Sequence, residues 1–194
     1  MSKIYRFSKD ERKILYTKFI ENLRNLKKRR KGEFVLLKRA LGKLTKEALD
    51  ALPVFYRCLP YKKAVEFVKA DVFEKELIYN REIYFLIATL FSFNNRPFKG
   101  SFGKTMQQVF LKTGSENIRK RMIRLVSSDF DYINDYAPGG GTITRNLEQC
   151  IRLASSYNVG VDWIQLLEDL IYWTHNDKFI QDRWIRDFSF YNKS

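Results

Sequence analysis

The sequence has few of the residues on which catalytic, metal-binding and disulfide chemistry depends. Its 194 residues include one histidine, His175, and two cysteines, Cys58 and Cys150, which are far apart and form no CxxC pair. Neither a zinc site nor a disulfide framework is indicated, and a Ser-His-Asp site would have to use His175 without an accompanying GxSxG motif. We expect both cysteines to be buried thiols, and we expect no cofactor, no metal and no catalysis.

Turn-forming residues and long apolar runs are also scarce. Only 9 glycines and 4 prolines are present, which disfavours the many turns of an all-β protein and favours helices. No stretch approaches the run of about 18 apolar residues that a membrane span requires. The first residues, MSKIYRFSKDERK, lack the apolar core of a signal peptide. These absences predict a soluble, cytoplasmic protein.

Apolar residues instead recur at helical spacing, which predicts an all-α protein. In 8–31, for example, Leu15, Phe19 and Leu23 follow one another at intervals of four, and 78–93 is apolar nearly all round, as expected of a buried central helix. We predict a compact bundle of about eight or nine helices in two packed subdomains. Helices are expected at 8–31, 34–42, 53–59, 61–69, 78–93, 102–112, 116–127, 143–156, 163–174 and 178–190, with a glycine-rich loop at 129–141.

Local signals refine these boundaries. Gly32 is expected to stop the first helix, Thr45 to cap a helix that starts there, and Asp162 to form a capping box with Gln165. For domain organisation, we predict a basic N-terminal helix or extension at 1–33 and a main helical domain at 34–194, with a subdomain division near 94–115.

Charge is distributed unevenly along the chain. The formal net charge is +14: residues 1–125 hold 30 basic and 12 acidic side chains, whereas residues 126–194 hold 6 and 10. A basic excess on a folded chain is typical of proteins that bind a polyanion such as nucleic acid, although it also serves solubility alone. The acidic last third suggests a surface that docks on another protein.

Basic residues gather on several predicted helices. In 116–127, an apolar stripe leaves Lys120, Arg121 and Arg124 on the opposite face. In 143–156, Arg145 and Arg152 lie seven residues, or about 10 Å, apart on the outer side. Further candidates are a patch of Lys38, Arg39 and Lys43 in and just after the predicted helix 34–42, and Lys104 at a helix start, where free N–H groups also attract phosphate. The run at 27–31 is either a phosphate-binding arm or a charge cluster that suits the helix C-terminus.

Two other site types fit parts of the sequence less well. Asp129, Asp131 and Asp135 alternate with aromatic residues and could hold Mg²⁺ in a nuclease, but they are also typical of turns, which we favour. The aromatic residues could stack on bases, yet most of them fall at helical core spacing, so we expect them inside the protein. Nucleic-acid contacts should therefore go mainly to the backbone, which carries no sequence information.

The order of short motifs resembles the CasB family, the small subunit of the type I-E CRISPR Cascade surveillance complex. The resemblance extends from about residue 34 to 191. It rests on LKRALG (37–42), PVFYRCLP (53–60), IATLFSF (87–93), SFGKTM (101–106), ENIRKRMIRLVSSD (116–129), VDWIQLLEDLIYW (161–173) and QDRWIRDF (181–188). Lys38 and Lys104 stand where the family more usually has arginine.

This resemblance implies a helical, non-catalytic subunit for antiviral defence that binds nucleic acid irrespective of sequence. Its implied partners are the large subunit, the guide-RNA-binding backbone subunits, the guide RNA and target DNA, especially the displaced strand of the R-loop, and a second copy arranged head to tail. No membrane is implied. The implied nucleic-acid-binding residues, taken together with the basic clusters, are Lys38, Arg39, Lys43, Arg57, Lys104, Arg119, Lys120, Arg121, Arg124, Arg145 and Arg152. Arg57 is equally well explained by an internal ion pair, and the alternative function is a protein–protein scaffold without nucleic-acid contact.

Overall fold

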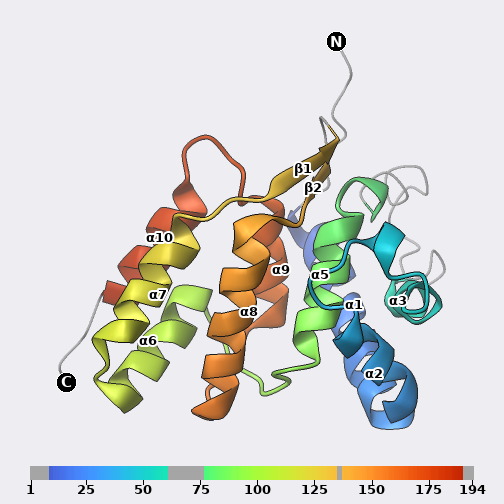
Figure 1. The fold of residues 1–194 in the computed structure, drawn as a ribbon, viewed down its shortest axis with the longest axis horizontal. Coiled ribbons are helices and arrows are strands. Elements are labelled where there is room, and N and C mark those ends of the chain that lie inside the picture. Colours follow the sequence, from blue (N-terminus) through green and yellow to red (C-terminus); the bar gives the residue numbers. More distant parts are fainter. Residues whose placement is uncertain (1–8, 61–76, 135–136, 190–194) are drawn as a thin grey trace.

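The structure of the protein, a computed structural model, describes residues 9–60, 77–134 and 137–189. Apart from one short hairpin, the regular elements in these residues are helices, which confirms the predicted all-α class (Figure 1). The helices are α1 (Lys9–Arg29), α2 (Lys31–Arg39), a 3₁₀ turn (Thr45–Glu47), α3 (Leu52–Cys58), α5 (Arg81–Phe91), α6 (Phe102–Thr113), α7 (Glu116–Val126), α8 (Gly141–Ser156), α9 (Trp163–Ile171) and α10 (Phe179–Ser189); the strands are β1 (Asp131–Asn134) and β2 (Ala137–Gly139). The helix predicted at 61–69 lies outside the described residues.

Helix α5 is the centre of the core, as its sequence predicts. Every residue from Ile83 to Phe91 is buried, because neighbouring helices cover all of its sides. Phe91 makes edge contacts with Phe34 of α2 and with Trp163 of α9, at ring-centroid distances of 6.3 and 5.3 Å. This one helix therefore joins the first part of the chain to the last.

Helix α1 belongs to the same core. Its apolar stripe, which includes Leu15, Phe19 and Leu23, is completely buried where α1 packs on α2, α3 and α9. The sequence sets residues 1–33 apart as an extension, but the described part of that segment is one of the walls of the bundle. The chain then turns into α2 at Lys31, so Gly32 lies within α2 and the prediction that it stops a helix is wrong.

Helices α6 and α10 approach so closely that one position between them must be glycine. A Cβ atom built on Gly103 would lie 2.1 Å from the backbone oxygen of Trp184. The Trp184 side chain is fully buried, and its ring packs at an angle against the rings of Phe102 and Trp173. The ring-centroid distances are 5.2 and 4.8 Å. The prediction that the tryptophans are core residues is confirmed.

The segment predicted as a loop at 129–141 contains an antiparallel hairpin instead. Asp131 pairs with Gly139, and Asn134 pairs with Ala137, with an irregularity between them. The glycines that follow serve the geometry of the helix start: Gly140 and Gly141 have φ angles of 69° and 77°, and a Cβ on Gly141 would lie 2.5 Å from the oxygen of Asp129.

Two capping predictions have different outcomes. At α9, Asp162 Oδ1 accepts a hydrogen bond from the Gln165 N–H at 3.1 Å, which confirms Asp162 as the N-cap. Thr45 is not a cap, because it is the first residue inside the 3₁₀ turn and both its hydroxyl and its N–H donate to the Glu82 carboxylate on α5, the N–H at 2.9 Å. The residue that begins the 3₁₀ turn is Leu44, whose N–H donates to Glu47 Oε2 at 2.9 Å.

Candidate nucleic-acid interface

Two predicted cations from helices far apart in the sequence meet over one aromatic ring. The ring is Phe93, which follows α5 and is half-buried. Lys38 Nζ of α2 lies 5.4 Å from its centroid and Arg152 Cζ of α8 lies 3.8 Å from it. Cations are attracted to the face of an aromatic ring at such distances, so Phe93 holds both charges at the surface of the bundle. Arg152 Nε also pairs with Glu148 Oε1 of the same helix at 2.8 Å, and the Arg152 side chain remains about half exposed.

Helix α8 extends this cationic site toward α7. Arg145, Gln149 and Arg152 share its exposed face, because residues three, four and seven apart lie on the same side of a helix. Gln149 Oε1 accepts a hydrogen bond from Arg121 of α7 at 3.0 Å, and Asn146 Nδ2 donates to the backbone oxygen of Arg124 at 3.4 Å. The surface formed by Lys38, Arg121, Arg124, Arg145 and Arg152 is called the α8 basic face below. Figure 1 shows its three helices, with α7 on one side of α8 and α2 on the other side, beyond α5.

Further cations, absent from the predicted set, gather at the C-terminal end of α8. Arg96 donates to the backbone oxygen of Ser155 at 3.1 Å, and Lys112 donates to that of Tyr157 at 2.9 Å. Cations are favoured there because the last carbonyls of a helix carry partial negative charge. The sequence shows Arg96 and Lys112 only as isolated basic residues, so no local signal could have placed them beside α8.

Lys27 of α1 lies close enough to Lys38 to be affected by its positive charge. Burial lowers the pKa of Lys27 below its ordinary value, and the positive charge of Lys38 lowers it further. Lys27 Nζ also lies 5.6 Å from the centroid of Phe34. A bound anion would relieve this repulsion, which is the electrostatic condition expected of an anion-binding surface.

Several predicted residues do not join this surface. Arg57 of α3 forms an ion pair with Glu33 of α2 at 2.5 Å, the internal pairing that the sequence left open. Arg119 lies on the other flank of α7, with its guanidinium carbon 5.5 Å from the ring of Phe110 of α6. Along the long axis of the molecule, α3 and α7 lie near opposite ends (Figure 1).

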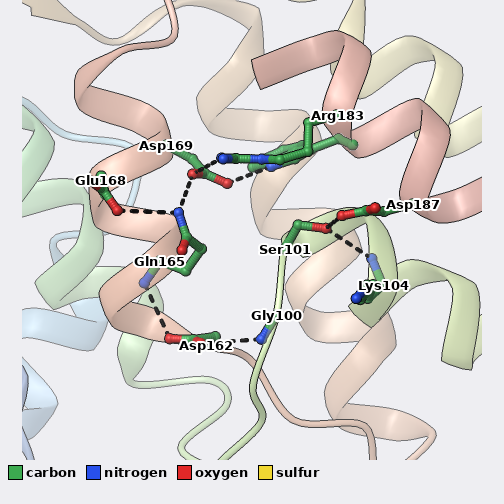
Figure 2. A network of polar contacts seen from close by, with 10 residues as sticks. Gly100, Ser101, Lys104, Asp162, Gln165, Glu168, Asp169, Arg183 and Asp187 are labelled. Atoms are coloured by element: carbon green, nitrogen blue, oxygen red, sulfur yellow. Dashed lines mark hydrogen bonds and ion pairs between the residues drawn. The ribbon is translucent and has the colours of Figure 1, made fainter. Parts of the chain in front are cut away.

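Lys104 lies at the start of α6, where a carboxylate already approaches. Ser101 Oγ accepts a hydrogen bond from the Lys104 N–H at 3.4 Å and donates to Asp187 Oδ2 of α10 at 2.5 Å (Figure 2). This helix end is therefore served by the protein's own side chains. The remaining predicted cations, Arg39, Lys43 and Lys120, are exposed and form no ion pair with another described residue.

Two of the residues considered for catalysis, Asp129 and His175, have structural partners. Asp129 Oδ1 forms an ion pair with Lys178 Nζ at 2.9 Å, and His175 Nδ1 accepts a hydrogen bond from the Asp177 N–H at 3.3 Å. Asp135 lies outside the described residues. Burial raises the pKa of both Cys58 and Cys150 to about 12, which keeps these thiols protonated and unreactive at neutral pH.

Within the described residues, no group of three or more histidine, cysteine, aspartate or glutamate side chains could hold a metal ion. None of the described helices is long and apolar enough to cross a membrane.

Comparisons with known proteins agree with one another on the family. Residues 33–188 match the family model for CRISPR-associated protein Cse2. A CRISPR-associated protein Cse2 from Thermus thermophilus is 26% identical over 134 residues, which is 68% of each chain.

Solved structures share the fold. A Cse2-family protein from Thermus thermophilus has a TM-score of 0.65 at 19% identity, covering 89% of this chain and 96% of its own. CasB from Thermobifida fusca has a TM-score of 0.63 at 13% identity, covering 90% and 97%. A chain of a CRISPR RNA-guided surveillance complex has a TM-score of 0.69 at 15% identity, covering 91% and 92%.

Proposed function

The chain belongs to the Cse2 family of CRISPR-associated proteins, and from this premise we propose that it is a non-catalytic subunit of a Cascade-type surveillance complex. In this role it binds the sugar–phosphate backbone of nucleic acid through the α8 basic face. The observation that carries the proposal is the convergence of Lys38 and Arg152 on Phe93, because it joins cations of two distant helices into one surface. A fold shared with a chain of an RNA-guided surveillance complex supports membership in such an assembly.

The chemistry of the α8 basic face suits recognition that ignores sequence. Its cations are lysine and arginine side chains on exposed helix faces, which contact phosphate oxygens rather than base edges. Opening a DNA duplex against a guide RNA is a nearly balanced exchange, so protein contacts to the backbone can shift it toward the open state. We therefore propose that the α8 basic face retains the displaced DNA strand and stabilises the R-loop during antiviral defence in the cytoplasm.

The proposal includes the partners implied by the sequence resemblance. These are the large subunit, the backbone subunits that hold the guide RNA, and a second copy of the chain. The alternative function, a scaffold that contacts only proteins, differs from it in one measurable property, the dependence of nucleic-acid binding on salt.

The first experiment measures single-strand binding by the purified chain at several salt concentrations. Arg145→Gln combined with Arg152→Gln should reduce the slope of log affinity against log salt by about 1.4, because each neutralised phosphate contributes about 0.7. The matched control is Arg57→Gln combined with Arg186→Gln, which removes the same charge from α3 and α10. Its slope should equal that of the unchanged protein.

The second experiment uses the assembled complex and an opened target duplex. The Arg145/Arg152 variant should release the displaced strand faster, whereas the Arg57/Arg186 variant should not. Equal strand retention by both variants would refute the α8 basic face as the binding surface and favour the scaffold.

A further inference from the structure

A large cavity lies between α1, α9 and α10, apart from the α8 basic face. Its volume is about 1100 Å³, at the upper limit of ordinary ligand sites. The walls are α1, α9, the start of α10 and the segment Pro97–Lys99, and no residue of the α8 basic face contributes to them. The wall formed by α1 precedes the residues that match the family model, which begin at residue 33.

Three cations line this cavity without a carboxylate to neutralise them. They are Lys13 and Arg24 of α1 and Lys99 in the segment before α6, all exposed. In the described part of the chain, none of the three forms an ion pair. Lys13 and Arg24 are eleven residues apart, which is close to three helical turns, so they share one face of α1 about 16 Å apart along its axis.

Aromatic side chains lie beside these cations. Phe179 at the start of α10 is 41% exposed, with the His175 ring 5.0 Å away in an edge contact, and its centroid lies 6.4 Å from that of Tyr172. Tyr172 is partly buried, and Arg12 Cζ lies 5.4 Å from its centroid. Phe98 also lines the cavity and is partly exposed. Aromatic rings that remain accessible next to cations are the combination that holds single-stranded nucleic acid, since bases stack on the rings while phosphates contact the cations.

The carboxylates of the cavity are largely engaged with the protein itself (Figure 2). Asp169 is buried and pairs with Arg183, and it accepts hydrogen bonds from Trp184 Nε1 at 2.6 Å and Gln165 Nε2 at 2.8 Å. Asp162 caps α9 and accepts from the Gly100 N–H at 3.2 Å. Glu168, which accepts from Gln165 Nε2 at 3.3 Å, is the carboxylate that most opposes an anion there.

We propose that this cavity is a second nucleic-acid site, which holds a short single-stranded segment with bases against Phe179, Tyr172 and Phe98 and phosphates at Lys13, Arg24 and Lys99. The distance between Lys13 and Arg24 exceeds the rise of about 3.4 Å per nucleotide in a stacked strand several-fold, so the segment spans more than one nucleotide. An acidic peptide fits the cations equally well but has no use for the exposed ring of Phe179 and the partly exposed rings of Phe98 and Tyr172, and the rings decide for nucleic acid.

The test uses the full chain and an oligodeoxythymidylate that carries 5-iodouracil, which cross-links to nearby aromatic side chains under light. Cross-linked peptides should contain Phe98, Tyr172 or Phe179. Lys13→Gln combined with Arg24→Gln should lower the cross-linking yield about tenfold at moderate salt, because two phosphate contacts are lost. Both side chains are exposed, so the melting temperature of this variant should not change.

Two single variants test the aromatic and acidic contributions. Phe179→Ala should weaken the cross-linked interaction about tenfold, since one stacking contact is removed, while Phe179→Tyr preserves it. Glu168→Gln should instead strengthen binding several-fold because it removes the opposing charge.

The two nucleic-acid sites fail independently in this design. If the α8 basic face does not bind, the Arg145/Arg152 variant behaves like the unchanged protein, while the cavity cross-links persist. The cavity proposal is overturned if cross-links map only to α7 and α8, or if the Lys13/Arg24 variant keeps its full yield. It is also overturned if an oligoglutamate peptide binds the cavity while the oligonucleotide gives no cross-link at Phe98, Tyr172 or Phe179.

Discussion

Replacing Gly103 by alanine inserts one methyl group where α6 meets α10. Alanine is the better helix former, so local propensity alone predicts a gain of about 1 kcal/mol in the free energy of unfolding. The structure predicts a loss. The added Cβ would lie 2.1 Å from the backbone oxygen of Trp184 and 2.8 Å from its Cα, and a backbone cannot move aside as a flexible side chain can.

The expected loss follows from the size of the required shift. The helices must separate by about 1.3 Å before the oxygen of Trp184 reaches the 3.4 Å of ordinary contact. That separation disturbs the packing of Trp184 against Phe102 and Trp173, and overpacking of this kind costs about 1–3 kcal/mol. The upper part of this range applies because the obstacle is backbone, so after the gain in propensity we expect a net loss of about 2 kcal/mol.

The assay is thermal unfolding followed by circular dichroism. A net loss of about 2 kcal/mol lowers the melting temperature by about 4–8 °C in a chain of this length. Gly32→Ala is the matched control, because Gly32 is also the second residue of a helix, α2, and has no neighbour within 4 Å of an added Cβ. This control should raise stability by about 0.5–1 kcal/mol. A Gly103→Ala protein as stable as the unchanged chain would refute the close approach of α6 and α10.

Three further predictions concern titratable groups. Cys58 and Cys150, whose pKa burial raises to about 12, should resist a thiol reagent at pH 8 in the native protein and react once urea unfolds it; rapid labelling of the native chain would contradict their burial. Burial raises the pKa of Asp169, while the hydrogen bond from Trp184 and the charge of Arg183 act in the opposite direction. Because the folded protein holds this proton more tightly than the unfolded chain, protonation of Asp169 stabilises the fold. That stabilisation is complete below the ordinary pKa of 3.8 and is lost as pH rises through the folded pKa. The difference in unfolding free energy between the unchanged protein and Asp169→Asn should therefore fall as pH rises. A difference that grows with pH would contradict the raised pKa. Glu33→Gln should cost less than about 1 kcal/mol in urea unfolding, because its pair with Arg57 is exposed, and a larger loss would show that the pair is shielded from water.

Helix periodicity was sufficient to predict the class of the fold and its central helix, because burial of one helix face leaves a pattern within a few turns of sequence. It could not predict where α1 ends, since the chain bends between Arg29 and Lys31 through tertiary packing and Gly32 continues as helix. Thr45 likewise has the composition of a cap, but its hydrogen bond goes to Glu82, which is 37 residues away in the sequence.

The candidate surface was predictable residue by residue but not as an arrangement. The sequence places Lys120, Arg121 and Arg124 on one exposed face of α7, yet it cannot say which flank meets α8. The structure turns Arg121 toward Gln149 of α8 and Arg119 toward Phe110 of α6, so two basic residues two positions apart face different helices. The aromatic platform of Phe93 is also a tertiary feature, because it follows α5 and receives cations from α2 and α8.

The acidic last third of the chain shows why net charge by segment is a poor guide to a surface. It carries a net charge of −4, and the sequence suggested that it docks on a protein. Several of its carboxylates have partners within the protein: Asp169 pairs with Arg183 and Trp184, Asp162 caps α9, and Asp187 accepts from Ser101, while Asp129 and Glu148 form exposed pairs with Lys178 and Arg152.

A carboxylate that is already bound to an internal partner contributes little to the field outside the protein. Arg145, from the same segment, is exposed and has no ion pair among the described residues. Its positive charge therefore contributes fully to the electrostatic potential outside the protein. The segment with the fewest cations thus supplies the central helix of the α8 basic face. Which charges reach solvent is decided by packing, and only the folded chain reveals it.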